Sequence, residues 1–323
     1  MNQIFSSHGE LPHLEAYFKH SVPKGCTPDF LYHYTKPDVL QFICRQHGRL
    51  LATNAAFFDD HSEIFHGAER FLDVLALDGE WSRSDILEFK QRLLSLRNKP
   101  FLFLPWITSL SCRKDSAKMW HDYTIQDGGY CIVFRYEGLA EFVKWSMMQR
   151  VNPADINTDC LFIMPCVYDG KHDIEGYVRA YNNDFRDVLS NRSNTNMVLA
   201  HLLVAGAFIK TSRYQFEHEW RMILIPAARR LMTDEILNLN NKPRLSLGFE
   251  KWLDDTRRLI AGILISPHGN HQKLRANAKK LVRDYMVHIN NSRPKIEISS
   301  LPTEYDKLIT YWDNSQQAYE LHT

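Results

Sequence analysis

Short hydrophobic segments of two different periodicities recur along the chain and predict strands interspersed with helices. The strand candidates are rich in aromatic and β-branched residues or alternate in polarity, and they cover residues 30–35, 49–53, 101–111, 130–136, 161–168, 217–226, 258–267 and 295–301. Apolar residues spaced three and four apart predict helices over about 37–48, 54–77, 84–97, 116–123, 171–210 and 274–289. Strand–helix and strand–strand steps follow one another without regular alternation, which predicts an α+β fold instead of a doubly wound parallel sheet.

The same pattern shows no break that would divide the chain. No internal repeat, low-complexity stretch or Pro/Gly-rich linker is present. We therefore expect one α+β domain over residues 30–302. A mixed lead-in over residues 1–29 precedes it, and a tail over residues 303–323 follows it.

Composition narrows the class of protein. Hydrophobic residues make up 44% of the 323 positions, enough for a sizeable core. The 39 basic and 38 acidic residues balance, so charge gives no reason to expect a dedicated nucleic-acid or membrane binder. Six cysteines without a C-x-x-C pair are typical of free thiols in a reducing compartment. Because no signal peptide or membrane-length apolar run is visible either, we expect a cytoplasmic protein.

The first candidate for chemistry is a histidine on the aromatic strand over residues 30–35. Strand alternation places Tyr32 and Tyr34 on one face and His33 with Thr35 on the other. A histidine at the end of a strand can donate or accept a hydrogen bond to a ligand hydroxyl. The alternative is that His33 only anchors the adjacent loop to the backbone.

The second candidate runs from Ser109 and Ser111 into the helix that carries Trp120 and Tyr123. These two aromatic residues are three apart, so they share one face of a helix. One ring could pack in the core while the other forms the wall of a pocket for a flat ligand ring. The alternative is that both rings belong to the core.

The third candidate is the acidic start of the strand over residues 217–226. On a strand, Glu217, Glu219 and Arg221 would share one face. Two neighbouring carboxylates raise each other's proton affinity, and an arginine opposes that effect. Such a cluster at the start of an apolar strand is typical of a charge-stabilising site. The alternative is an exposed strand start with an ordinary surface ion pair.

A fourth group has side chains of the kinds that bind metals, but their spacing matches no metal motif. It comprises Asp59, Asp60, His61, Glu63 and His66. A helix cap formed by Asp59 or Asp60 is the simpler interpretation, and the turn around His268 and His271 is interpreted in the same way. The chain contains no G-x-S-x-G or phosphate-loop motif.

The motifs of the chain resemble those of a bacterial family known as domain of unknown function 2971. The resemblance spans about residues 31–302 and is carried by the segments LYHYT, FDDHSE, SLSCRKDSAKMWHDYTIQDGGYCIVF, FIKTSRYQFEHEWRMI and KIEISSLP. The M-W-x-x-Y and E-x-E-W-R blocks are its most specific parts. One departure is Asp59, where the family usually has Asn.

The order of these motifs is also similar to that of the ADP-ribosyltransferase superfamily, especially its His-Tyr-Glu branch. The matching residues are His33, Ser109 and Ser111, Tyr123, Gly128 and Gly129, and Glu219, with Glu217 as the additional acid. This resemblance implies a mixed, largely antiparallel split sheet flanked by helices, with NAD as substrate. It also implies transfer of ADP-ribose to an unknown acceptor or hydrolysis of NAD.

The second resemblance further implies a role for each matching residue. His33 would bond a ribose hydroxyl, Thr35 would hold the nicotinamide amide with Tyr34 beside it, and Tyr123 would stack on the nicotinamide ring. Glu219 would stabilise the cation that forms as nicotinamide leaves, and Glu217 would orient or deprotonate the acceptor. The remaining ligand-binding positions would be Ser109, Ser111 and Trp120, with Lys210 and Arg221 meeting the pyrophosphate or holding the acids.

Three functional hypotheses therefore remain open. The first is an NAD-dependent ADP-ribosyltransferase-like enzyme, in the setting of a bacterial toxin or a phage-defence effector that a partner protein holds inactive. Its acceptor would be a protein, a nucleic acid or a small molecule. The second is a non-catalytic nucleotide-binding or interaction module. The third is a metal-dependent hydrolase that uses Asp60, His61, Glu63 and His66.

Overall fold

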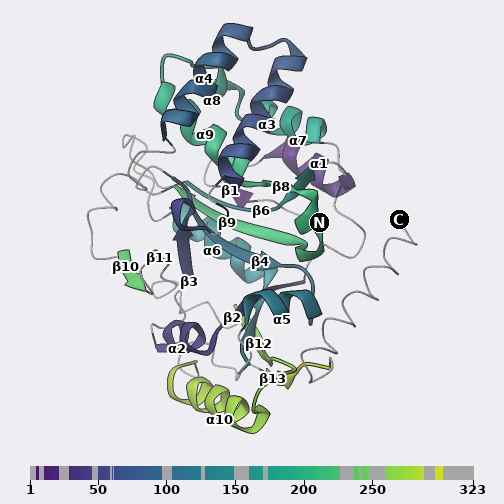
Figure 1. Ribbon diagram of the computed structural model, residues 1–323, viewed down its shortest axis with the longest axis vertical. Helices are drawn as coiled ribbons and strands as arrows, with labels where there is room; N and C mark the ends of the chain where they lie inside the picture. The colour runs from purple at the N-terminus through teal and green to yellow at the C-terminus, as the bar shows by residue number, and fades with distance from the viewer. Residues whose placement is uncertain are drawn as a thin grey trace.

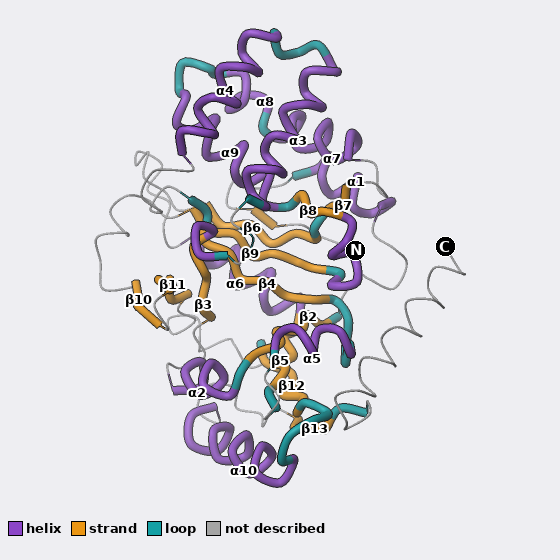
Figure 2. The backbone as a smooth tube through the Cα atoms, viewed as in Figure 1, coloured by secondary structure: helices purple, strands orange, loops and turns teal. Residues whose placement is uncertain are grey.

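A mixed β-sheet carries the fold of the computed structural model (Figures 1 and 2). The structure describes residues 5–6, 11–21, 29–45, 50–58, 60, 62–96, 104–124, 128–148, 160–169, 174–225, 236–239, 242–247, 259–286 and 295–300. Within these residues the main sheet has 11 strands, and its central path runs in the order β1-β6-β9-β4-β2-β5-β12-β13. The separate strand pair β7 (Val167–Asp169) and β8 (Ile209–Thr211) is parallel.

The strands of the central path are antiparallel except at one edge, where β12 and β13 are parallel. The path comprises β1 (Phe5–Ser6), β6 (Cys160–Pro165), β9 (Glu219–Ile225), β4 (Trp106–Ser111), β2 (Phe30–Thr35), β5 (Tyr130–Arg135), β12 (Ile260–Ile265) and β13 (Lys295–Ile298). Strands β3 (Leu50–Asn54), β10 (Ile236–Leu239) and β11 (Lys242–Leu247) extend from β4 as a side branch. The predicted α+β class with a mixed, largely antiparallel sheet flanked by helices is confirmed.

The sheet is split in its middle, between β2 and β4. Strand β4 pairs with β9 from Trp106 to Ser111. Along its other edge it pairs with β3 at its first two residues and with β2 only where Ser111 lies opposite Tyr32. By contrast, β2 pairs with β5 along all of its six residues. The central residues of β4 therefore face a gap between two half-sheets, and this gap positions the candidate site.

Helices cover the sheet in groups (Figures 1 and 2). One core cluster joins the sheet to α2 (Pro37–Arg45), α6 (Tyr136–Met148) and α10 (His271–Leu281). A second cluster joins it to α1 (Pro12–Ser21), α3 (Glu63–Asp78), α4 (Arg83–Leu96), α7 (Ile174–Asp184), α8 (Arg186–Ser190) and α9 (Thr195–Ala207). A small third cluster packs α5 (Ala117–Tyr123) on β2 and β5. Short helical turns lie at Ala55–Phe57, Ser212–Glu217 and Val282–Met286.

Helices α3 and α9 cross in close backbone contact at a pair of glycines. A Cβ atom added to Gly67 would lie 2.1 Å from the carbonyl oxygen of Gly206, and one added to Gly206 would lie 2.3 Å from the backbone nitrogen of Ala68. Helix α3 begins with Glu63, and α9 ends with Ala207. The crossing therefore fixes where the start of one helix lies relative to the end of the other.

Several element boundaries differ from the sequence prediction. The strand predicted over residues 217–226 begins at Glu219, because His218 adopts a left-handed conformation (φ 41°) after a 3-10 turn that ends at Glu217. The segment 161–168 forms two strands, and the last part of the predicted helical region, Ile209 and Lys210, is extended. The predicted lead-in contributes α1, whose Leu14 and Phe18 are buried in the core. The predicted tail lies outside the described residues.

Two further expectations from composition concern the described residues. Cys44, Cys112, Cys131 and Cys166, the cysteines recorded within the described residues, are thiols outside any disulfide, as the spacing of the cysteines predicts. Across the helices that the structure describes, none combines the length and the apolar character needed to cross a membrane.

Candidate functional site

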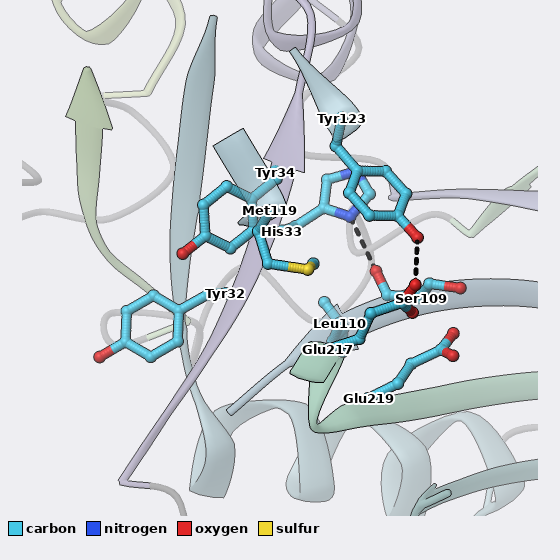
Figure 3. A pocket seen from close by; sticks show the side chains of 9 residues that line it. All are labelled: Tyr32, His33, Tyr34, Ser109, Leu110, Met119, Tyr123, Glu217 and Glu219. Atoms are coloured by element: carbon cyan, nitrogen blue, oxygen red, sulfur yellow. Dashed lines mark hydrogen bonds between the residues drawn. The ribbon is translucent and has the colours of Figure 1, made fainter. Parts of the chain in front are cut away.

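A pocket of about 60 Å³ lies at the split between β2 and β4 (Figure 3). Side chains from four separate segments line it, namely Tyr32, His33, Tyr34, Ser109, Leu110, Met119, Tyr123, Glu217 and Glu219. The hydroxyl groups of Tyr32 and Tyr34 point away from the two carboxylates, so these tyrosines present ring surface to the pocket. The structure therefore brings together His33, Tyr123 and the two glutamates, which lie far apart in the sequence.

His33 bridges the gap between the two half-sheets. Its Nδ1 lies 3.0 Å from the backbone carbonyl oxygen of Ser109. A carbonyl oxygen only accepts hydrogen bonds, so Nδ1 must carry a proton. Burial lowers the pKa of His33, an effect that the Ser109 carbonyl partly opposes. A neutral imidazole with its proton on Nδ1 has a lone pair on Nε2, and among the described residues no hydrogen-bond partner for Nε2 is found.

The lowered pKa of His33 predicts how stability depends on pH. The unfolded histidine, with a pKa of about 6.5, binds a proton more readily than the folded one. The contribution of neutral His33 to the free energy of unfolding is therefore fully present above about pH 6.5. This contribution falls as the pH drops toward the lower pKa of the folded state. We expect His33→Gln to remove this part of the pH dependence, measured as urea unfolding free energy at several pH values. The exposed His20 provides the control: if His20→Gln flattens the profile as much as His33→Gln does, the assignment fails.

Helix α5 holds its two aromatic residues in different environments. Its first turn is capped by the Ser116 side chain, which accepts a hydrogen bond from the backbone N–H of Met119. Trp120 is fully buried, donates its indole N–H to Asp115 at 2.8 Å and packs edge-on against Tyr34. Tyr123, at the end of the helix, is 37% exposed and lines the pocket. The interpretation with one core ring and one pocket ring fits this arrangement, and Trp120 does not line the pocket.

Tyr123 also contacts the acids of the site. Its hydroxyl group donates to Oε1 of Glu217 at 3.3 Å, as Figure 3 shows. Burial and the neighbouring Glu217 carboxylate raise the pKa of Tyr123. The phenol therefore stays protonated and acts as a hydrogen-bond donor.

Glu217 and Glu219 are both only 4% exposed, which contradicts the alternative of an exposed strand start with a surface ion pair. They do not share a strand face by simple alternation, because Glu217 precedes the strand and His218 turns the chain between them. The Ser111 hydroxyl donates to the Glu217 carbonyl oxygen at 2.6 Å, and the Glu219 N–H donates to the Tyr168 hydroxyl at 2.8 Å. These bonds fix the backbone on both sides of the turn.

A chain of buried charges connects the two glutamates to α3. The Lys210 ammonium group lies 2.5 Å from Oε2 of Glu217 and 2.6 Å from Oε2 of Glu219. Arg221 donates to Glu219 through Nε at 2.9 Å, to the Ala207 carbonyl oxygen at 2.5 Å, and to Glu63. The order of charges is thus Glu217, Lys210, Glu219, Arg221, Glu63, with three acids and two bases.

The two acids of the pocket differ in their proton affinity. Burial raises the pKa of Glu217, although Lys210 opposes the shift. Burial acts in the same direction on Glu219, but Arg221 and Lys210 outweigh it and hold the pKa of Glu219 well below its usual value. Burial would lower the pKa of Lys210, yet the Glu219 carboxylate raises it instead. Glu219 is therefore the more readily ionised member of the pair.

Five residues that were expected to bind the ligand lie off the pocket lining, namely Thr35, Ser111, Trp120, Lys210 and Arg221. Lys210 and Arg221 were predicted either to meet the pyrophosphate or to hold the acids, and in the structure they hold the acids. Sequence reasoning did not foresee that Glu63 belongs to this cluster. Its position in the F-D-D-x-x-E segment was the available signal, but the nearby aspartates and histidines directed attention to metal binding. Met119 and Leu110 were also missed, since apolar residues beside strands resemble core residues.

The potential metal ligands around α3 face different partners. Asp60 bonds Ser62 and Arg213, Glu63 bonds Arg221, and His66 lies 3.3 Å from Asp169. Among the described residues, no group of three or more such side chains is arranged to hold a metal ion. Asp59 and His61 lie outside the described residues. The predicted helix cap by Asp60 is wrong: the N-cap residue of α3 is Ser62, and the Asp60 side chain accepts from the N–H and the hydroxyl of that residue instead of from an N–H inside the helix.

Comparison with known proteins confirms part of the predicted family resemblance. No curated protein and no solved structure matches the chain significantly. A family model does match within the segment from 31 to 302 where the resemblance was expected. Residues 119–222, which include Tyr123, Glu217 and Glu219, match the family described as Protein of unknown function (DUF2971).

Proposed function

We propose that the protein is an NAD-dependent ADP-ribosyltransferase-like enzyme that transfers ADP-ribose to an acceptor or to water. The observation that carries the proposal is the shared pocket, in which an imidazole, an exposed phenol ring and two buried carboxylates come from three separate segments. Aromatic walls suit a flat ring, and buried carboxylates suit a centre where positive charge develops. The positively charged nicotinamide of NAD offers both features.

The geometry supports a role for each pocket residue. His33 has its lone pair on Nε2 and accepts a hydrogen bond from a ribose hydroxyl group. Tyr123 lines the pocket, is partly exposed and provides a ring for stacking against nicotinamide. The acids provide negative charge that is fixed in place by Lys210 and Arg221. Such preorganised charge is usually the largest single contribution to catalysis.

The proposed reaction breaks the bond between the ribose C1′ and the nicotinamide nitrogen. The bonding electron pair leaves with nicotinamide, which becomes neutral, and positive charge develops on the ribosyl group. A hydroxyl, an amine or water then bonds to C1′ and loses a proton. With water, NAD is converted to ADP-ribose, nicotinamide and one proton.

The function is tested by incubating the purified full-length protein with NAD labelled in nicotinamide. We expect released nicotinamide, and we expect Tyr123→Ala to lower kcat/KM by about 2- to 13-fold, which corresponds to the ~0.5–1.5 kcal/mol of a stacking contact. Tyr123→Phe keeps the ring and serves as the matched variant, with a smaller loss. No release of nicotinamide with protein, nucleic acid or water as acceptor would refute the proposal, and NAD binding without turnover would favour a non-catalytic module.

A further inference from the structure

The hydrogen bonds of Glu219 leave it little capacity for a ligand. Its Oε1 accepts from Nε of Arg221 at 2.9 Å, while Oε2 accepts from Lys210 at 2.6 Å and from Nη2 of Arg221 at 3.0 Å. A carboxylate has about four lone-pair sites, and three of them are occupied here by charged donors. Such charge-assisted bonds are roughly twice as strong as neutral ones. A ligand hydroxyl would have to compete with two buried cations for this carboxylate.

Glu217 is held differently. Its Oε2 accepts from Lys210 at 2.5 Å, but the one partner of Oε1 within the described part of the chain is the Tyr123 hydroxyl, at 3.3 Å. Hydrogen bonds between oxygen atoms are usually about 2.7–2.8 Å long, so this contact is weak. Among the carboxylate oxygens of the two pocket glutamates, Oε1 of Glu217 is therefore the one most easily given to a ligand. The 3-10 turn and the Ser111 hydroxyl nevertheless fix the Glu217 backbone.

The balance of charge also favours Glu217 as the acid that is available to a ligand. The five linked side chains comprise three acids and two bases, so one negative charge is not compensated within the cluster. Arg221 lies between Glu219 and Glu63, and Lys210 lies between Glu217 and Glu219. Glu219 thus has two cationic neighbours, whereas Glu217 and Glu63 each have one. Of these last two, only Glu217 lines the pocket.

We infer that, of the two pocket glutamates, Glu217 is the one that contacts the ligand, and that Glu219 is a positioning residue that holds Lys210 and Arg221 in place. This assignment reverses the roles that the order of motifs implies for the two glutamates. It takes the ligand from the proposed function, where Glu217 meets the positively charged ribosyl centre or the hydroxyl group beside it. Tyr123 then exchanges its bond to Oε1 for a stacking contact as the ligand enters.

The first test compares NAD turnover by the full-length protein and three variants. Glu217→Gln is expected to lower kcat by ~10²–10³-fold, with KM close to that of the unaltered protein and a smaller loss of unfolding free energy than Glu219→Gln causes, because Lys210 keeps its bond to Glu219. Glu217→Asp should recover part of this loss because it restores the charge. Glu219→Gln should mainly lower stability, with a smaller loss of kcat, while Glu88→Gln on the exposed face of α4 is the control. The inference is overturned if folded Glu219→Gln loses more kcat than Glu217→Gln.

A second test does not depend on turnover. The side-chain carboxyl carbons of the glutamates are labelled with ¹³C, and the two resonances are assigned by their loss in the Glu217→Gln and Glu219→Gln variants. We expect the Glu217 resonance to titrate at higher pH than that of Glu219 and to move when nicotinamide is added. The assignment would be overturned if the Glu219 resonance titrated at higher pH than that of Glu217. It would also be overturned if nicotinamide moved the Glu219 resonance alone. If titration follows the expected order but neither NAD turnover nor a nicotinamide shift occurs, the proposed function fails and the order of the two acids stands.

Discussion

Replacing Arg221 by methionine is expected to lower the free energy of unfolding by about 3–5 kcal/mol, the usual effect of removing one partner from a buried ion pair. The guanidinium group is 1% exposed and bonds Glu219, Glu63 and the Ala207 carbonyl oxygen. Methionine replaces the aliphatic part of the arginine side chain but has none of the five N–H donors. The buried carboxylate of Glu219 and the partly buried one of Glu63 would then lose a cation, and one carbonyl oxygen would lose a donor. Urea unfolding followed by circular dichroism measures the change.

The matched control for Arg221 is Arg92, which forms an exposed ion pair with Glu88 one helical turn away. Exposed pairs of this kind contribute about 0.3–0.5 kcal/mol, so Arg92→Met should change stability only slightly. If the two variants lose similar amounts, the buried charges are not coupled to folding in the way proposed. A variant that does not fold at all would agree with the larger loss.

The second large effect is expected at the helix crossing. Replacing a glycine in the middle of a helix by alanine normally stabilises the helix by about 0.5–1 kcal/mol. At this position, however, the new Cβ atom would lie 2.1 Å from the Gly206 carbonyl oxygen, so α3 and α9 must move apart. Overpacking typically costs about 1–3 kcal/mol and occasionally more. We therefore expect Gly67→Ala to lower the free energy of unfolding, measured by denaturant unfolding. A loss of stability where this substitution usually gives a gain is the result that identifies the close contact.

Two further variants test this explanation of Gly67. Gly206→Ala should have a comparable effect, because its Cβ atom would approach the Ala68 nitrogen to 2.3 Å. Gln91→Ala, on the exposed side of α4, should stay within about 0.5 kcal/mol of the unaltered protein. Stabilisation by Gly67→Ala would show that the two helices are not in close contact. Since α3 starts at Glu63 and α9 ends at Ala207, both partners of Arg221, loss of this contact should also loosen the charge cluster.

The hydrophobic pattern was sufficient to predict most elements of the fold. The aromatic segment at Phe30 forms β2 with the predicted limits, and Ser116 caps α5 as its position suggested. These features depend on local propensity and spacing, which are legible in a single sequence. The start of β9 was misplaced by two residues, because the left-handed conformation of His218 is imposed by its surroundings and is unusual for a residue other than glycine.

Four members of the candidate site were predictable from the sequence, but their connections were not. Polar residues beside strands pointed to His33, Tyr123 and the two glutamates, and the structure places all four around one pocket. The partnership of Glu63 with Arg221 joins residues 158 positions apart, and no local pattern encodes such a contact. Likewise, Lys210 could be assigned to an anionic ligand or to the acids with equal reason until the three-dimensional arrangement was known.

The sparse pairing between β2 and β4 has a mechanical consequence. Among the described residues, the backbone pairing of these neighbouring strands is confined to Tyr32 and Ser111, and the imidazole of His33 adds a bond to the Ser109 carbonyl oxygen, which makes this boundary a seam within the sheet. Any occupant of the pocket touches both sides of the seam, because His33 comes from one side and Glu217 and Glu219 from the other. Occupancy and the relative position of the two half-sheets are therefore thermodynamically linked. A substitution in either half-sheet that changes the seam would alter affinity without contacting the bound molecule.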